Sequence, residues 1–157
     1  LMRQPRVFHL LQKAHTALFR AADHALKTQL GLSTTQQAVL FSLAQHDGAP
    51  ISQIADQLHM GYSSLTGLVD RMETRGLVTL RQSQADARSV HVFIEDKGRA
   101  MVQAATPFTK GINAALLEPF SPTEQNTIER FLDHVATNAT DVVDHHANTA
   151  HQERFSA

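Results

Sequence analysis

The apolar residues of this chain change their spacing once, near Gly76, and this change constrains the fold more than any other feature. From residue 51 to residue 75 they recur every three or four positions, as on one face of a helix. From residue 78 to residue 94 they alternate with other residues, as in strands with one buried face. The sequence therefore predicts helices followed directly by a two-stranded ribbon.

Two helices separated by a tight turn are predicted in the first part of this stretch. Ser52 is the expected N-cap of a short helix, and residues 59–61 form the turn. The second helix is predicted over residues 62–75, with Gly76 ending it. The positions expected to be buried are Ile51, Ile54, Ala55 and Leu58 on the first helix, and Leu65, Leu68, Val69 and Met72 on the second.

The ribbon that follows has strands around residues 78–80 and 90–94, joined by a polar loop over residues 82–88. A short helix, a turn, a second helix and a β-ribbon together are typical of a winged helix-turn-helix domain. In such a domain the second helix enters a DNA major groove roughly 12 Å wide. The fold class predicted is mainly α, with a two-stranded β-wing.

Long helices are predicted on both sides of this core. One spans about residues 6–30 and ends at Gly31, and Ser33 with Gln36 forms a capping box for the next. That next helix is expected to bury Val39, Leu40, Leu43 and Ala44. A further helix covers residues 96–117, bent or broken at Pro107, and Ser121 with Glu124 starts the last one.

Composition excludes several classes of protein. The chain has no cysteine, so it has neither disulfides nor a thiolate metal site. No apolar run approaches the roughly 18 residues that span a membrane, and the N-terminal segment lacks a signal-peptide pattern. We therefore expect a soluble, cytoplasmic protein without membrane contact, and no cofactor motif is present.

The formal net charge of −1 is unevenly distributed. Residues 1–50 carry five basic against two acidic side chains, residues 51–99 carry six of each, and residues 100–157 carry three against seven. The acidic excess therefore lies outside the predicted winged helix. Overall charge neither supports nor excludes nucleic-acid binding.

The stretch from Ile51 to Gly98 resembles the DNA-binding core of the MarR transcriptional regulators. The matching motifs are Leu68-Val-Asp-Arg71, Arg75-Gly-Leu-Val78, Arg81, the wing pair Asp86-x-Arg88, and Lys97-Gly98. The likeness extends to the helices on both sides. The chain departs from the family at Ala87, where the wing usually has arginine, at Glu95, which replaces a common threonine, and at Gly67, where a larger side chain is usual.

The resemblance implies a domain organisation. Residues 33–99 would form the winged helix-turn-helix, residues 1–32 and 100–148 a helical dimerisation region, and residues 149–157 a flexible tail. A homodimer would then bind double-stranded DNA at a pseudo-palindromic operator.

The side chains expected to contact DNA lie on the second helix and the wing. Asp86 is expected to orient the Arg88 side chain through a charge-assisted hydrogen bond. Arg71 and Arg75 could equally be a solvated edge or ion-pair partners. The candidates are Tyr62, Ser63, Ser64, Thr66, Gly67, Arg71, Arg81, Asp86 and Arg88.

The resemblance also implies a small aromatic or phenolic effector, or its thioester. Phe19 and Phe41 could line its pocket, with His15 or Arg20 meeting a carboxylate or hydroxyl. Ordinary core or interface roles for these four residues stay an alternative. The function expected is a ligand-responsive repressor rather than an enzyme.

Three other functions are alternatives to this one. Asp141, His145, His146 and His151 could make the protein a metal-responsive regulator, but no metal-binding motif surrounds them, and we expect no metal site. A small helical enzyme is disfavoured, because no phosphate loop or nucleophile motif occurs. A winged helix used only for protein contacts would show no salt-dependent DNA affinity.

Overall fold

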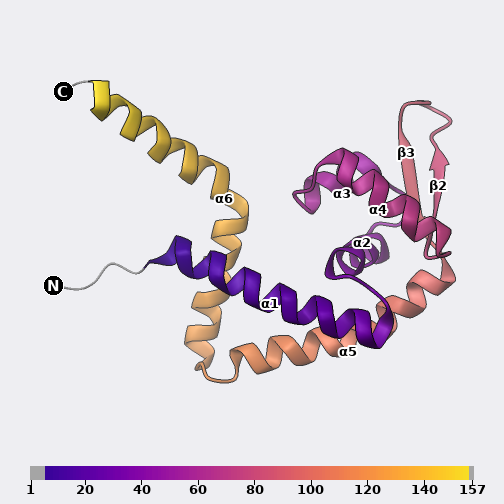
Figure 1. Cartoon of the computed structure of the whole chain (residues 1–157), viewed down its shortest axis with the longest axis horizontal. Helices are drawn as coiled ribbons and strands as arrows, with labels where there is room; N and C mark the ends of the chain where they lie inside the picture. The colour runs from indigo at the N-terminus through magenta and orange to yellow at the C-terminus, as the bar shows by residue number, and fades with distance from the viewer. Residues whose placement is uncertain (1–5, 156–157) are drawn as a thin grey trace. The chain divides into compact units, whose positions relative to one another are not determined.

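The computed structural model describes residues 6–155, with side chains described for residues 6–147. In chain order its elements are α1 (Val7–Leu30), α2 (Thr34–Gln45), β1 (Ala49–Pro50), α3 (Ile51–Gln57), α4 (Tyr62–Thr74), β2 (Val78–Gln82), β3 (Val90–Ile94), α5 (Asp96–Leu117) and α6 (Pro122–Phe155) (Figure 1). The chain divides after Thr109 into two compact units. The mainly helical fold with an antiparallel wing confirms the predicted winged helix-turn-helix class.

The wing is part of a three-stranded antiparallel sheet in the order β1-β3-β2. Strands β2 and β3 pair from Val78 opposite Ile94 to Gln82 opposite Val90, and extend from the helices as a hairpin (Figure 1). Strand β1 was not predicted. It adds Ala49 opposite Val92 at the other side of β3. Pro50 is tolerated there because an edge strand leaves one side of its backbone unpaired.

The core of the first unit lies between α2, α3, α4 and the sheet. The predicted helix-turn-helix positions are buried, apart from Leu58, which is half-buried. In α2, Val39, Leu40 and Leu43 are buried as predicted, whereas Ala44 is exposed. The expectation for Ala44 was wrong, and the stripe of α2 is narrower than its spacing indicated.

The end of α1 and the start of α2 follow the predicted local chemistry, whereas the start of α3 does not. Gly31 ends α1 in the left-handed region at φ 64°. At α2, the Gln36 amide donates to Ser33 Oγ over 3.1 Å and the Ser33 amide donates to Gln36 Oε1 over 3.0 Å, which confirms the capping box. For α3 the predicted N-cap was wrong: Pro50 occupies that position in extended backbone, and Ser52 lies inside the helix.

Helix α5 has the predicted bounds, whereas α6 is longer than predicted. Helix α5 runs from Asp96 to Leu117 with Pro107 inside it, so no break occurs there. Helix α6 starts at the predicted cap, where the Ser121 amide donates to Glu124 Oε2 over 2.8 Å. It continues to Phe155, past the boundary expected at residue 148. Flexibility of residues 149–157 stays a prediction, and residues 156–157 lie outside the described part.

Helix α5 packs closely on the strand region at Gly98. A Cβ atom there would overlap the carbonyl oxygen of Leu77 and would lie 2.9 Å from Cγ1 of Ile94. The Leu77 carbonyl also accepts a hydrogen bond from the Glu95 amide over 3.0 Å. This contact fixes the start of α5 against β2 and β3.

Candidate nucleic-acid interface

Helix α4 presents an exposed polar face beginning at its N-terminus. Ser63 and Ser64 are exposed, and Tyr62 is 52% exposed despite its large ring. Gly61 precedes the helix in extended backbone and supplies no side-chain cap. The first amides of α4 therefore have no side-chain acceptor from the cap residue, and such amides favour an anionic partner.

The middle of this face is formed by Thr66 and Gly67, both half-buried. The Thr66 hydroxyl donates to the Tyr62 carbonyl over 2.9 Å, so its donor is used within the helix. Beyond the adjacent residues and the backbone of α4, a Cβ atom added at Gly67 would meet Nη1 of Arg71 alone among the described residues, at an ordinary contact distance of 3.5 Å. Glycine inside a helix destabilises it by roughly 1 kcal/mol relative to alanine.

The two arginines at the end of α4 differ in their surroundings. The Arg75 guanidinium donates to Gln36 Oε1 over 3.3 Å, and the Arg75 carbonyl accepts from Lys97 Nζ over 2.8 Å. Arg71 is exposed, and within the described residues its guanidinium makes no hydrogen bond or ion pair. Arg75 is therefore tied to the fold, while Arg71 keeps its donors available.

Arg81 lies on β2, one residue before the loop end of the strand. Its guanidinium carbon is 4.8 Å from the centroid of the Phe93 ring on β3, a cation–π distance. The rest of the side chain is exposed. Phe93 therefore holds the charge beside the ribbon without consuming its hydrogen-bond donors.

The wing loop is organised by its own polar side chains. Ser83 Oγ accepts from the amides of Ala85 and Asp86, and the Ser89 amide donates to the Asp86 carbonyl. Asp86 Oδ1 accepts from the backbone amide of Arg88 over 3.0 Å. The expectation that Asp86 would bond the Arg88 side chain was wrong, because a residue two positions later offers its amide at closer reach. The Arg88 side chain is exposed.

Residues that the sequence did not single out join the wing to the helices. Asp47 Oδ1 accepts from the Ile94 amide over 2.8 Å, and its Oδ2 pairs with Arg99 over 2.6 Å. His91 Nδ1 lies 2.8 Å from the Gly48 carbonyl. Asp47-Gly48 could be recognised only as a break between helices, since both partners lie more than 40 residues later.

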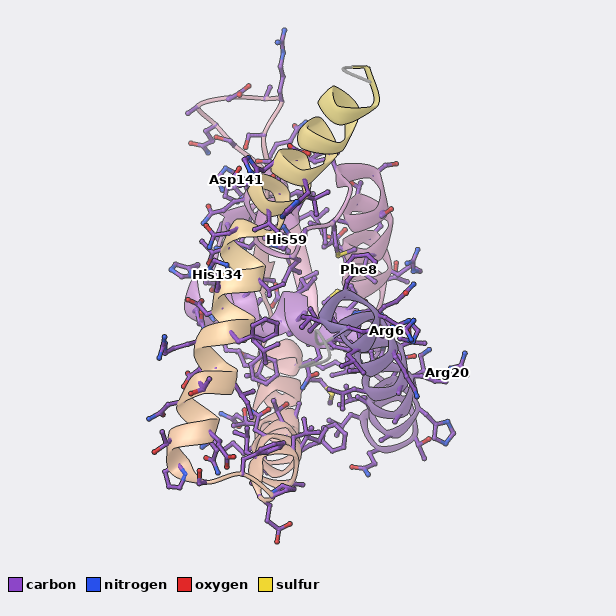
Figure 2. All side chains as sticks on the ribbon, turned by 90° about the vertical axis from the view of Figure 1, so that its left-hand side faces the viewer. Arg6, Phe8, Arg20, His59, His134 and Asp141 are labelled. Carbon is purple, nitrogen blue, oxygen red and sulfur yellow. The ribbon has the colours of Figure 1, made fainter. Side chains whose placement is uncertain are left out.

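The four residues proposed for an effector pocket are only partly brought together. The rings of His15 and Phe19 stack with centroids 4.5 Å apart. Arg20 points outward from α1 (Figure 2) and lines a shallow hollow of about 410 Å³ with His9 and Lys13. His15, Phe19 and Phe41 do not line that hollow. The effector pocket therefore stays a prediction.

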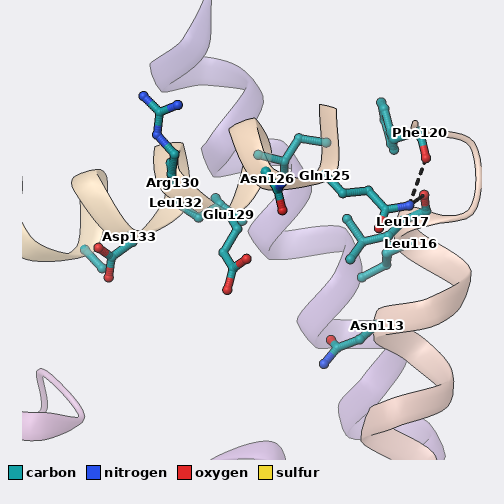
Figure 3. Close-up of a pocket in the computed structure, with 12 residues that line it drawn as sticks. Asn113, Leu116, Leu117, Phe120, Gln125, Asn126, Glu129, Arg130, Leu132 and Asp133 are labelled. Carbon is teal, nitrogen blue, oxygen red and sulfur yellow. Dashed lines mark hydrogen bonds between the residues drawn. The ribbon is translucent and has the colours of Figure 1, made fainter. Parts of the chain in front are cut away.

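The second unit contains an open hollow of about 1300 Å³ between the end of α5 and the start of α6 (Figure 3). Gln125 lies at one end, where its side-chain Nε2 donates to the carbonyls of Leu117 and Phe120 over 3.0 and 2.8 Å. Leu116 and Leu132 line it and remain about half exposed. Small-molecule sites are smaller and more enclosed, so this hollow does not have the form of one.

Helix α6 carries the residues of the metal hypothesis. His134 and Asp141 project from it (Figure 2), and a shallow hollow is lined by Asp141, His145 and His146, among others. Across the part of the chain with described side chains, no group of three His, Cys, Asp or Glu could hold a metal ion. His151 lies outside that part. Among the residues that the structure describes, no helix is long and apolar enough to cross a membrane.

Comparison with known sequences matches residues 32–90 to the model of the MarR family. The curated relative "HTH-type transcriptional repressor NicR" from Pseudomonas putida is 30% identical over 111 residues, which are 69% of this chain and 68% of that protein. With two other curated relatives the chain spans about half of their length, 54% and 47%.

Two solved structures share the fold. The DNA complex of MepR from S. aureus has a TM-score of 0.79 at 20% identity, covering 87% of this chain and 99% of MepR. BpsR from Bordetella bronchiseptica, whose DNA binding is regulated by 6-hydroxynicotinic acid, has a TM-score of 0.76 at 23% identity. That alignment covers 84% of this chain and 99% of BpsR.

Proposed function

Since this chain belongs to the MarR family, we propose that it is a sequence-specific DNA-binding transcriptional regulator that contacts DNA through α4 and the wing. The observation that carries the proposal is the pairing of an exposed, uncapped α4 N-terminus with an exposed wing arginine on one folded unit. Tyr62, Ser63 and Ser64 would meet the major groove, and Arg88 would meet the adjacent minor groove or backbone.

The DNA complex would be formed by a homodimer. Two copies of α4 would enter successive major grooves about 34 Å apart, at a pseudo-palindromic operator. The proposal is supported by apolar side chains that stay exposed on the flanking helices and on the α5–α6 connection of a single chain. These are Phe8, Leu10, Phe19, Leu116, Phe120, Phe131, Leu132, Val142 and Val143.

Electrostatic attraction to DNA would be modest in this protein. Ala87 replaces a basic residue usual in the family's wing, and Asp70 and Asp86 are exposed acidic groups near the candidate arginines. If Arg81 and Arg88 of both subunits contact phosphates, log affinity against log salt should have a slope of roughly −4. Base contacts and dimer geometry would then supply most of the specificity.

We further propose that the protein is a repressor released by a small aromatic acid or its thioester. NicR, which is described as a repressor, and BpsR, which responds to 6-hydroxynicotinic acid, support this choice of effector class. A tenfold loss of operator affinity needs only about 1.4 kcal/mol of coupling between the two sites. A thermal-shift screen with aromatic acids and their thioesters would identify ligands, and a gel shift would show whether they release DNA.

The DNA-contact assignment can be tested with Arg88→Ala. Duplexes selected from a random pool by the wild-type protein serve as the operator. We expect Arg88→Ala to weaken binding at least severalfold in gel-shift titrations, because an exposed guanidinium is lost from the wing. Lys110→Ala, which removes an exposed positive charge from α5, is the matched control and should bind as the wild type does.

Two results would count against the proposal at different levels. An unchanged affinity for Arg88→Ala would show that the wing does not contact DNA through this residue. If the wild-type protein bound no duplex in a salt-dependent manner, the DNA-binding function itself would be wrong.

A further inference from the structure

Gly67 lies inside α4, yet the fold of the chain gives no reason for a glycine there. Its backbone φ is not in the left-handed region, unlike that of Gly31 or Gly76. Its surroundings leave room for a Cβ atom, unlike those of Gly98. A residue that weakens its own helix without a structural need points to a constraint outside the folded chain.

Apart from the adjacent residues and the backbone of α4 itself, the one described atom within 4 Å of a Cβ at position 67 would be Nη1 of Arg71, one helical turn later. The Arg71 guanidinium therefore lies beside the space that a side chain would occupy if residue 67 were not glycine. Arg71 is exposed, and no hydrogen bond or ion pair holds its guanidinium among the described residues. At Gly67 the surface of α4 therefore carries no side chain, and beside it lies the planar Arg71 guanidinium, whose N–H donors make no hydrogen bond among the described residues.

We infer that Gly67 is a specificity-determining residue, which lets α4 lie deep in the major groove and keeps the Arg71 guanidinium against the helix to bond a guanine edge. The inference rests on the proposed function. Arginine donates in bidentate fashion to O6 and N7 of guanine, the commonest specific contact in protein–DNA complexes. A side chain longer than alanine at position 67 would both displace Arg71 and hold the helix away from the bases.

Arg71 could in principle donate to a phosphate instead, and the two targets leave different signatures. Loss of a phosphate contact weakens binding to all sequences alike and lowers the salt slope by about 0.9 per contact. Loss of a base contact relaxes the preference at one base pair of each half-site. The proposal commits to the base edge.

The experiment compares the full-length protein with its variants Gly67→Ala, Gly67→Gln, Arg71→Ala and Arg71→Lys. Wild-type protein first selects its preferred duplex from a random pool. Each variant is then titrated against that duplex and against its single-base-pair substitutions, at several salt concentrations. Thermal unfolding is measured in parallel, with Gly111→Ala in α5 as the matched control, because Gly111 is also a helix-interior glycine where a Cβ atom would meet no clash.

We expect stability and specificity to move in opposite directions. Gly67→Ala and Gly111→Ala should each raise Tm by about 2–4 °C, since both replace a helix-interior glycine. Only the Gly67 variants should lose affinity, Gly67→Gln more than Gly67→Ala. Discrimination at one guanine position should fall roughly 5- to 150-fold in Gly67→Gln and in Arg71→Ala.

The Lys variant separates positioning from charge. Arg71→Lys should keep the salt slope and lose the discrimination, because an ammonium cannot make the planar bidentate contact. Combining Gly67→Gln with Arg71→Ala should cost no further discrimination if both act through the same base contact.

The inference is overturned if Gly67→Gln binds the selected duplex and its substitutions as the wild type does. It is also overturned if Arg71→Ala weakens all duplexes equally with a lower salt slope. Both results require a wild-type protein that binds DNA, so they differ from a failure of the proposed function, in which no duplex is selected at all.

Discussion

At Gly98 the backbone of α5 passes so close to Leu77, the residue before β2, that no side chain fits. The obstacle is a backbone carbonyl, that of Leu77, and it is itself held by the Glu95 amide. Flexible side chains can move aside at small cost, but a hydrogen-bonded carbonyl cannot move without shifting β2 or α5. Overpacking at such a position costs typically 1–3 kcal/mol.

We therefore predict that Gly98→Ala lowers the free energy of unfolding by about 1–3 kcal/mol. Urea denaturation followed by circular dichroism would measure the change. Gly111→Ala is the control, because it makes the same substitution at a helix position with open space around it. A Gly98→Ala protein as stable as the wild type would mean that α5 can shift away from β2 freely.

His59 is held in a backbone conformation that is unfavourable for a residue with a Cβ atom. It is the only non-glycine residue with positive φ in the described part of the chain, at 50°, and it lies in the turn between α3 and α4. Residues with a Cβ atom pay roughly 1–2 kcal/mol in this region. The next amide, that of Met60, donates to the Ala55 carbonyl over 2.9 Å and so holds the turn in place.

His59→Gly should relieve this strain and stabilise the protein by up to about 1 kcal/mol, after the greater unfolded-state entropy of glycine is offset. His59→Ala keeps the Cβ atom and should bring no such gain. Differential scanning calorimetry of the two variants would resolve them. Equal melting temperatures for both would show that the αL backbone at this position carries no strain.

At the scale of the elements, an ion pair and a hydrogen bond of one carboxylate stabilise the junction of α1 with α2. Asp23 on α1 pairs with Lys27 over 2.6 Å, and its Oδ1 accepts from the Thr34 amide at the start of α2 over 2.9 Å. The hydrogen bond from Lys27, followed by that from the Thr34 amide, lowers the pKa of Asp23 below its usual value. The carboxylate form therefore stabilises the junction.

The sign of the pH dependence follows from this lowered pKa. A carboxyl whose pKa is depressed by folding contributes stability above its unfolded pKa of about 3.9, and loses it as the pH falls through the folded value. We predict that Asp23→Asn is less stable than the wild type by a constant amount above about pH 5. The difference should shrink as the pH falls below about 4, first because the unfolded wild-type chain takes up a proton there and then because the folded carboxyl is protonated at its lower pKa.

Denaturant unfolding from pH 3 to pH 7 would measure this difference. Asp56→Asn in α3 is a suitable control, because the Asp56 side chain makes no hydrogen bond or ion pair within the described residues. A stability difference for Asp23→Asn that did not change with pH would show that the charge of Asp23 does not stabilise the junction of α1 with α2.

Element boundaries were predictable where their cause is local. Ser33 and Gln36 lie three residues apart and cap α2 by themselves, and Ser121 with Glu124 acts in the same way at α6. Ser52 looked equally suitable as a cap, but β1 draws the chain into extended backbone up to Pro50, so the cap and the helix start lie two residues earlier. A pairing with β3, about 40 residues later, decided that boundary.

In the candidate site, too, the features with a local cause could be predicted and the others could not. The exposed face of α4 follows from the helix period and the exposure of Arg88 from its place in the polar wing loop, and both could be predicted. The partner of Asp86 could not, because a carboxylate can reach either the amide or the guanidinium of Arg88 and only the loop conformation selects between them. Likewise, the contacts of Asp47 and His91 exist only once β3 is folded against the α2–α3 connection.

For the whole molecule, the exposed apolar side chains have a consequence for assembly. They lie mostly on α1, α5 and α6, and Leu132 and Val143 are 49% and 58% exposed in a single chain. Apolar surface of this extent on helices typically marks a protein interface. It supports the proposed homodimer, although the domain boundaries at residues 32 and 100 stay a prediction.

We predict that Leu132→Asp weakens the dimer at least tenfold, because it would place an unpaired charge in an apolar interface. Sedimentation equilibrium over a range of protein concentrations would measure the dissociation constant. Thr137→Asp puts the same charge at an exposed polar position of α6 and should leave it nearly unchanged. If Leu132→Asp dimerised as tightly as the wild type, this part of α6 would lie outside the interface.

The two-residue strand β1 limits how far the DNA-reading part could be reduced in size. Ala49 and Pro50 lead directly into α3, and their backbone partners are Val92 and His91 at the far side of the wing. A peptide cut before residue 90 would keep both helices of the reading motif but lose the strand that anchors their entry. Engineering a minimal DNA reader from this chain therefore requires a segment that retains β3 and the Gly98 contact beyond it, even though neither needs to touch DNA.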